Sequence, residues 1–285
     1  MKYNNDHDYI EALENKLESA SQGNESLLVD LRKDAALERL ASRFDPAKSA
    51  VKGGFGVRTL VPGGPLTQDM DILIDNKEWQ GLTKQQAYQL VAEHIVDHMT
   101  MEGQDRFKFT PTSAAQFIDL GPDQAAARIW AQVSVADRSF GTIIIDAGIK
   151  EPAVPVQQGH GRDVLGFAEV ENPVITTVSR EWLAADKITL LLEQGIEGDR
   201  PRDVVHAALL LEEGQYNEGA LSAWLEKLAD KRGVAGLLME PIEQPTKMWG
   251  LKVNSICERF GLQLTVESCY ERIGGVLDRL FGRER

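Results

Sequence analysis

The stretch from Ser49 to Asp75, SAVKGGFGVRTLVPGGPLTQDMDILID, constrains the fold of this chain more than any other. It predicts a short strand at Ala50–Val51, a turn at Gly53–Gly54 that opens a helix, and then a loop and a second strand. The second strand carries Asp69 and Asp71, which stand two residues apart. Residues i and i+2 of a strand point to the same side, so the two carboxylates are expected to lie together.

These residue types suit phosphate and metal chemistry. Two carboxylates aimed at one point are good ligands for a hard divalent cation such as Mg²⁺. Glycines let backbone N–H groups approach an anion closely, and a helix N-terminus favours phosphate. Together the two features are the minimal equipment for metal-dependent transfer of a nucleotidyl group. Taken singly, Gly53–Gly54 is also an ordinary turn, and the Asp-x-Asp is also an ordinary strand end.

The second strand continues from Asp71 with Ile72, Leu73 and Ile74, which we expect to enter the core. With 285 residues, of which 42% are hydrophobic and 26% charged, the chain has the composition of an ordinary globular protein with room for two domains. No segment approaches the roughly 18 uninterrupted apolar residues of a membrane span, and no secretory signal is visible. We therefore expect a cytoplasmic protein without a membrane partner, in which Cys257 and Cys269 are buried free thiols.

The net charge of −13 argues against a protein that grips nucleic acid over its whole surface. An RNA acceptor would need a local basic patch. The scattered candidates for such a patch are Arg39, Arg43, Lys48, Lys52, Arg58, Arg200 and Arg202. A small-molecule acceptor, or a basic partner protein, is equally compatible with this charge balance.

The remaining periodicities predict an α/β part followed by a helical part. Residues 1–23 are expected to form a solvated helix and linker, residues 24–178 an α/β domain, and residues 179–285 a helical domain. Further strands are predicted over 106–110, 128–136, 139–147 and 173–177, the middle two joined as a hairpin. Further helices are predicted over 83–99, 180–194, 200–213, 218–231, 241–259 and 265–281, and Asn24 and Ser179 are expected to cap helices.

Two further groups of side chains have both a functional and a structural interpretation. Asp146 follows the apolar run Thr142–Ile145, where it is either a third metal ligand or catalytic base, or a strand-end residue that caps a turn. His94 and His98 share a helix face at a spacing that zinc can use, but no third ligand is evident. We therefore expect two ordinary helix-face histidines.

The helical part contains two charged residues that also need both interpretations. Lys187 lies in an otherwise apolar helix, where it is either a cation for a triphosphate or a surface lysine with a solvated head. Asp203 lies in the first turn of its helix, where the helix dipole favours a carboxylate whatever its function.

The chain thus shows, in order, a Lys-Gly-Gly turn, an Asp-x-Asp strand, a later lysine helix and a helix that begins with a basic residue and Asp. In this order the chain resembles the AbiEii/AbiGii-type nucleotidyltransferase toxin family, within the polymerase-β-like nucleotidyltransferase fold. The resemblance covers about residues 27–213. The residues that carry it are Arg39-Leu40-Ala41, Lys52-Gly53-Gly54, Thr67-Gln68-Asp69-Met70-Asp71, Ala184-Ala185-Asp186-Lys187 and Arg200-Pro201-Arg202-Asp203.

The resemblance implies an α/β (α+β) catalytic domain with a mixed sheet and flanking helices, followed by an all-helical C-terminal domain. It implies that Gly53 and Gly54 contact the phosphates of an NTP. Lys52, Thr67 and Arg202 are the further nucleotide-binding residues that it implies.

The resemblance also implies the catalytic and metal-binding set. Asp69 and Asp71 would hold Mg²⁺, with Mn²⁺ as a possible substitute. Lys187 would bind the triphosphate, and Asp203 would support the site or orient that lysine. Asp146 as a third metal-binding carboxylate comes from the wider fold, not from a local motif.

The function that the resemblance implies is Mg²⁺-dependent transfer of NMP from an NTP to an acceptor hydroxyl, with tRNA as the expected acceptor. The protein would be the toxin of a bacterial toxin–antitoxin or abortive-infection system, with a cognate antitoxin. The chain departs from the family pattern in having Pro65-Leu66 where a basic residue often stands, and Val204-Val205-His206 where an aromatic residue and a second Asp often follow. These departures leave two alternatives open: a small molecule or protein as acceptor, and a degenerate member that binds nucleotide or a partner without chemistry.

Overall fold

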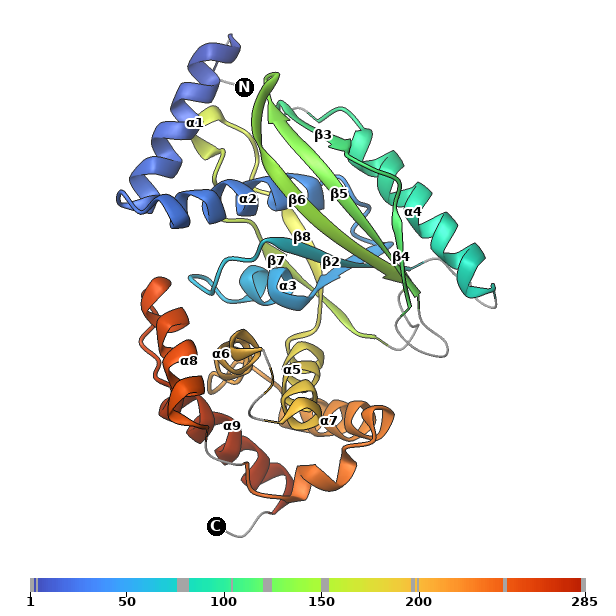
Figure 1. Cartoon of the computed structure of the whole chain (residues 1–285), viewed down its shortest axis with the longest axis vertical. Coiled ribbons are helices and arrows are strands. Elements are labelled where there is room, and N and C mark those ends of the chain that lie inside the picture. The colour runs from blue at the N-terminus through green and yellow to red at the C-terminus, as the bar shows by residue number, and fades with distance from the viewer. Residues whose placement is uncertain are drawn as a thin grey trace. The chain divides into compact units, whose positions relative to one another are not determined.

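The computed structural model of the chain consists of two compact units (Figure 1). The first comprises residues 1–60 and 66–177, and the second comprises residues 61–65 and 178–285. The structure describes residue 3 and residues 5–75, 82–103, 105–119, 125–149, 154–195, 198, 200–242 and 245–282.

A mixed eight-stranded sheet forms the centre of the first unit, in the order β3-β5-β6-β2-β1-β8-β7, with β4 also paired to β5. The strands are β1 (Ser49–Lys52), β2 (Asp69–Ile74), β3 (Phe107–Pro111), β4 (Gln116–Asp119), β5 (Ala125–Val135), β6 (Arg138–Ile149), β7 (Val156–His160) and β8 (Val174–Val178). Strand β2 lies between β1, with which it is antiparallel, and β6, with which it is parallel.

The predicted hairpin is confirmed, because β5 and β6 pair antiparallel along most of their length. The turn between them consists of Ala136 and Asp137, whose φ angles of 46° and 65° are both left-handed. Two left-handed residues are what a tight hairpin turn requires, since they match the twist of the strands.

The hydrophobic core covers one face of the sheet. Helices α1 (Asp6–Ser21), α2 (Glu25–Ala41) and α4 (Lys84–Thr100) pack there against alternate residues of the strands. On β2 these core residues are Met70, Ile72 and Ile74, each at most 1% exposed. Leu73 points to the opposite face together with the two aspartates, where it is also buried at 9% exposed, so the expectation that Ile72, Leu73 and Ile74 run into the interior is confirmed.

The expectation of a solvated first helix is wrong. Tyr9, Leu13 and Leu17 of α1 are buried in the core of the first unit. The Tyr9 hydroxyl donates a 2.9 Å hydrogen bond to the backbone oxygen of Asp105. The spacing of these apolar residues indicated a helix, but their burial depends on neighbours that lie far away in the sequence.

The described part of the second unit is built from helices and loops, as predicted. Its helices are α5 (Arg180–Gln194), α6 (Pro201–Leu210), α7 (Glu218–Arg232), the short 3₁₀ helix η3 (Ala235–Met239), α8 (Lys247–Arg259) and α9 (Val266–Phe281). The predicted caps are confirmed, since Asn24 accepts from the Leu27 amide and Ser179 from the Trp182 amide. Throughout the described residues, each helix is too short or too polar to cross a membrane.

Cys257 and Cys269 are confirmed as buried free thiols. They lie on α8 and α9. Burial raises the pKa of the Cys269 thiol to about 12, so it stays protonated at neutral pH.

A buried ion cluster joins α2 to helix α3 (Gly53–Leu60), the helix that begins at the glycine turn. Arg58 of α3 donates to the carboxylates of Asp34 and Glu38, which stand one turn apart on α2, with 2.7 Å to Glu38. Glu38 also accepts from the Arg39 guanidinium at 3.0 Å and from the Arg162 amide at 2.7 Å. Because these carboxylates are 1% and 0% exposed, water cannot replace the arginine.

We predict that Arg58→Ala lowers the free energy of unfolding by about 3–5 kcal/mol, because it removes the cation that two buried carboxylates share and leaves Asp34 with only Arg162 at 3.9 Å. The control is Arg32→Ala, which breaks an ion pair to Glu14 whose side chains are 32% and 26% exposed. The free energy of unfolding of that variant should fall by less than about 1 kcal/mol. Urea denaturation measures both, and equal losses would show that the cluster does not hold α3.

Candidate active site

Asp69 and Asp71 lie on the face of the sheet opposite the core helices, which we call the carboxylate face. Their neighbours on β2 alternate with them and are buried, while Asp69 is exposed and Asp71 half-buried. The parallel pairing with β6 places Asp71 level with Asp146 and Asp69 level with Ile144. The structure therefore brings the three carboxylates that were predicted from the sequence onto one face of two neighbouring strands.

The same register extends across five strands. Lys52 of β1 stands opposite Asp71, Asp146 of β6 stands on its other side, and Arg128 of β5 stands opposite Asp146. Gln116 of β4 continues the row beyond Arg128. Paired residues in neighbouring strands share a face. The charges along this row are therefore those of a cation, two adjacent anions and a second cation.

Arg128 was not among the residues predicted from the sequence. Its Nε donates to Asp146 Oδ1 at 2.7 Å and its Nη2 to Oδ2 at 2.6 Å, a two-pronged pair. These hydrogen bonds, opposed by partial burial and helped by the charges of Asp146, Asp69 and Asp71, raise the pKa of the guanidinium above its usual value. A positive charge is thus fixed beside the carboxylates.

Asp71 lies directly against Gly53 at the start of α3. A Cβ added at Gly53 would stand 2.0 Å from Asp71 Oδ2, and the glycine has a left-handed φ of 59°. Only a residue without a side chain fits this close approach. The carboxylate therefore lies next to a helix N-terminus, which stabilises negative charge.

Asp69 is positioned by the loop before β2. The Thr67 hydroxyl donates to Asp69 Oδ1 at 2.6 Å and is itself buried. The intervening Gln68 donates to Asp30 of α2 at 3.1 Å and accepts from Lys33 at 3.2 Å. These contacts give Thr67 a positioning role toward Asp69, which adds to the nucleotide contact expected from the sequence.

The carboxyl oxygens on this face fit a magnesium ion. Mg²⁺ is commonly bound through one or two carboxylates plus phosphate and water oxygens, so Asp69 and Asp71 offer a suitable donor set. Among the described residues, no group of three or more acidic, histidine or cysteine side chains is arranged to hold a metal ion by itself. The remaining ligands would come from substrate and water.

The second unit brings Lys187 and Asp203 together. Lys187 Nζ lies 2.9 Å from Asp203 Oδ1, and their side chains are only 8% and 10% exposed. The interpretation of Lys187 as a surface lysine is therefore wrong. Arg200 Nη1 reaches the other carboxylate oxygen at 3.4 Å, while Arg202 on the first turn of α6 is half-buried.

His206 completes this group and was not predicted as a site residue. Its Nδ1 lies 4.0 Å from Asp203 Oδ1 and has no hydrogen-bond partner in the described residues. Burial, the charge of Lys187 and, more weakly, that of Arg202 lower the pKa of His206 to about 3, against the opposite effect of Asp203. The imidazole is therefore neutral next to a charged pair.

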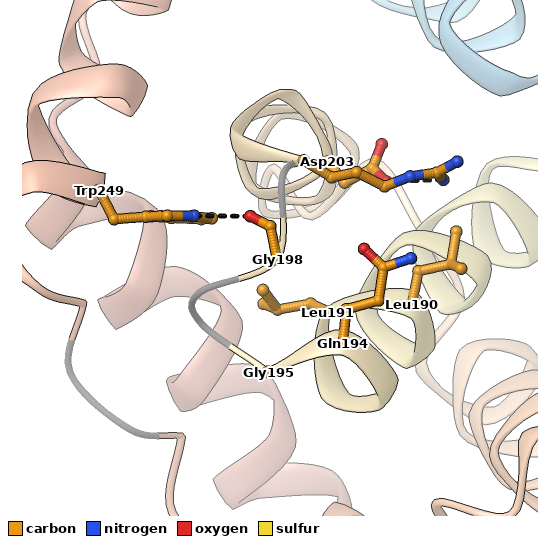
Figure 2. A pocket seen from close by; sticks show the side chains of 8 residues that line it. Leu190, Leu191, Gln194, Gly195, Gly198, Asp203 and Trp249 are labelled. Atoms are coloured by element: carbon orange, nitrogen blue, oxygen red, sulfur yellow. Dashed lines mark hydrogen bonds and ion pairs between the residues drawn. The ribbon is translucent and has the colours of Figure 1, made fainter.

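A small pocket adjoins this group (Figure 2). Asp203 and Arg200 line one part of it, and Trp249 of α8 lines another. The Trp249 indole donates a 2.9 Å hydrogen bond to the backbone oxygen of Gly198, which ties α8 to the segment before α6. The other lining residues are Leu190, Leu191, Gln194, Gly195 and Gly198.

His94 and His98, the two histidines at a spacing that zinc can use, have partners within the protein. Phe44 stacks on the ring of His98, whose Nδ1 donates to the His94 backbone oxygen at 2.9 Å. These histidines are ordinary helix-face residues, as expected.

Three of the scattered basic candidates are not available to RNA. Arg39 and Arg58 are 3% and 2% exposed within the buried ion cluster. The Arg43 side chain is 6% exposed and donates to the backbone oxygens of Met99, Met101 and Phe107. These three arginines therefore cannot contribute to a basic patch that would hold an RNA.

Comparison with known proteins supports the resemblance drawn from the motifs. Residues 35–261 match the family described as "Nucleotidyl transferase AbiEii toxin, Type IV TA system". No curated protein sequence matches the chain. The solved structure of MenT4, a nucleotidyltransferase toxin from Mycobacterium tuberculosis H37Rv, is similar with a TM-score of 0.53 at 14% identity, covering 95% of this chain and 99% of that one. The likeness confirms the expected fold class.

Two further solved structures show weaker similarity. JHP933 from Helicobacter pylori has a TM-score of 0.46 at 11% identity, covering 89% of this chain and 92% of that one. An antigenic nucleotidyltransferase-like protein from Paracoccidioides brasiliensis has a TM-score of 0.38 at 14% identity, covering 72% and 88%.

We predict that Gly53→Ala displaces Asp71, because the new methyl group and the carboxylate would occupy the same space. Mn²⁺ affinity, measured by calorimetry, should fall by about tenfold or more, since one of the two candidate carboxylate ligands would be moved. The control is Gly63→Ala, which also has a positive φ but nothing within 4 Å of the added atom. If both variants bind Mn²⁺ like the wild type, the close approach of Asp71 to Gly53 is not needed.

We also predict that His206 makes the fold sensitive to acid. In the native state its pKa is about 3, whereas the ordinary value is 6.5, so below pH 6.5 the unfolded chain binds the extra proton. Stability should therefore fall with falling pH, by at most about 1.4 kcal/mol per pH unit from this residue. Urea denaturation at pH 7, 6 and 5 should show a shallower decline for His206→Gln. The exposed His160, changed to Gln, is the control and should keep the wild-type slope.

Proposed function

We propose that this chain, which belongs to the AbiEii family of nucleotidyltransferase toxins of type IV toxin–antitoxin systems, transfers NMP from an NTP to an acceptor hydroxyl and releases pyrophosphate. Membership makes the chain a nucleotidyltransferase, and it implies an antitoxin as partner. The proposal concerns the residues that carry the reaction, the metal and the acceptor.

The observation that carries the proposal is the pair Asp69 and Asp71 on one face of β2, with Asp71 against the start of α3. A Mg²⁺ ion held there would neutralise phosphate charge and favour ionisation of the acceptor hydroxyl. Thr67 holds Asp69 in place through its hydroxyl. The backbone of Gly53 and Gly54 opens a helix whose N-terminus attracts the phosphates of the NTP.

Lys187, Asp203 and Arg202 of the second unit are proposed to act on the triphosphate. The ammonium of Lys187 is a compact charge that suits phosphate oxygens. Asp203 holds this ammonium at 2.9 Å, and so restricts where the long side chain can point. Arg202 supplies a further cation one residue earlier on α6.

We propose tRNA as the acceptor and the cytoplasm as the place of action, on the basis of the family resemblance. A specific observation favours the second candidate, a small molecule or a protein side chain. The net charge is −13, and Arg39, Arg43 and Arg58 are buried in internal contacts. An RNA would have to be held by other cations.

We predict that purified protein incubated with Mg²⁺, bacterial tRNA and each α-³²P-labelled NTP in turn transfers label to the tRNA. Asp69→Asn and Asp71→Asn should each reduce transfer by at least about a thousandfold, because the metal loses a charged ligand. The control is Asp137→Asn on the exposed hairpin turn, which removes the same charge at the far end of β5.

The products distinguish the alternatives. Label on the protein or on a small molecule, lost in Asp71→Asn, would retain the transferase and replace the acceptor. No turnover of any NTP, alone or with an acceptor, would point to the degenerate, non-catalytic member. Full activity of either Asp variant would contradict the proposed site.

A further inference from the structure

We propose that Asp146 holds Arg128 in place and does not ligate the cation, and that Arg128 binds a phosphate group of the NTP beside a cation held by Asp69 and Asp71. This inference rests on the proposed function and assigns a role to a residue that the sequence motifs do not include. Asp146 stands where the wider fold would place a third metal-binding carboxylate. Here that carboxylate would fix a guanidinium in the site instead.

The first observation is that both oxygens of Asp146 are used by Arg128. The two hydrogen bonds, of 2.7 and 2.6 Å, engage one oxygen each. A divalent cation in contact with either oxygen would stand close to the guanidinium, and like charges at such separations repel strongly in a partly buried site. The cation therefore favours Asp69 and Asp71, because both of these hydrogen bonds of Arg128 go to Asp146.

The second observation is that Arg128 has N–H groups that its hydrogen bonds to Asp146 do not use. Nε and one N–H of Nη2 face Asp146, while Nη1 has no acceptor among the described residues. Its side chain is 39% exposed and that of Asp146 is 18% exposed, so the unused edge of the guanidinium can be reached from solvent. A planar fork of N–H groups is well suited to phosphate oxygens.

The third observation is the position of Arg128 relative to the aspartates. It stands on the same face and in the same row, two strands away from Asp71, which is about 10 Å between the backbones. The long side chain of Arg128 can extend across that distance toward a phosphate chain that lies beside Asp71. Without Arg128 the face would present Asp69, Asp71 and Asp146 to a polyanionic substrate with Lys52 as the remaining cation of that row.

A β-bulge in the hairpin produces this arrangement. Ser134 pairs with Ser139, but Val133 pairs with Gly141, so Phe140 is an extra residue on β6. A hairpin without the extra residue would set Arg128 opposite the buried Ile145. The bulge sets it opposite Asp146, and bulges of this kind re-aim side chains next to functional sites.

The first test measures binding of Mn²⁺ alone by calorimetry. Asp71→Asn should lose at least about tenfold in affinity, whereas Asp146→Asn should stay within about threefold of the wild type. Arg128→Gln frees Asp146, so its affinity should equal or exceed that of the wild type. In that background the added Asp146→Asn change should lower Mn²⁺ affinity more than it does in the wild type.

The second test measures binding of inorganic triphosphate in EDTA, which removes metal. Arg128→Gln should weaken binding by about tenfold, since a charge-assisted contact is lost. Arg128→Lys keeps the charge but not the fork, and should recover only part of this loss. The matched control is Lys108→Gln, which removes one cation from the same sheet, where it pairs with Asp137. Its affinity for triphosphate should stay within about twofold of the wild-type value.

The outcomes separate this inference from the proposed function. Wild-type Mn²⁺ affinity in Asp71→Asn would contradict the proposed cation site itself. Loss of Mn²⁺ affinity in Asp146→Asn as large as in Asp71→Asn would make Asp146 a ligand and overturn the inference alone. Unchanged triphosphate binding in Arg128→Gln would overturn the role of Arg128. Thermal unfolding of each variant verifies that it is folded.

Discussion

The parallel pairing of β2 with β6 determines where the charges of the candidate site lie. It sets Asp71 level with Asp146, and the antiparallel pairing with β1 sets Lys52 on the other side. This register is enforced by the opposite face, where Met70 and Ile72 are buried in the core. A slip of one residue would turn these side chains to solvent and bury the aspartates, at a cost that no gain on the carboxylate face could offset.

Compensation of charge is the second constraint on the first unit. Asp34 and Glu38 are buried in α2 and depend on Arg58, which in turn fixes the helix that starts at Gly53. On the carboxylate face Asp146 has its own arginine. The 2.7 and 2.6 Å hydrogen bonds of Arg128 both go to Asp146 and not to Asp69 or Asp71, and this difference is what marks Asp69 and Asp71 as the acidic pair for a cation.

Features with a local cause were predictable from the sequence, and those that depend on tertiary pairing were not. Asn24 and Ser179 were recognised as caps, and the period of a strand placed Asp69 and Asp71 together. Strands β4 and β7 were missed, because each is short and lacks an apolar run. Arg128 was missed because its partner depends on the bulge at Phe140, and counting back from the turn without that bulge pairs position 128 with 145.

The most direct measurement of the central claim is an anomalous difference map from crystals grown with Mn²⁺ and a non-hydrolysable NTP analogue. The account predicts a peak about 2.1–2.2 Å from carboxylate oxygens of both Asp69 and Asp71. The phosphates of the analogue should lie beside the peak, toward the start of α3. A bound nucleotide with no Mn²⁺ at these two residues, or a peak that is held elsewhere in the chain, would contradict it.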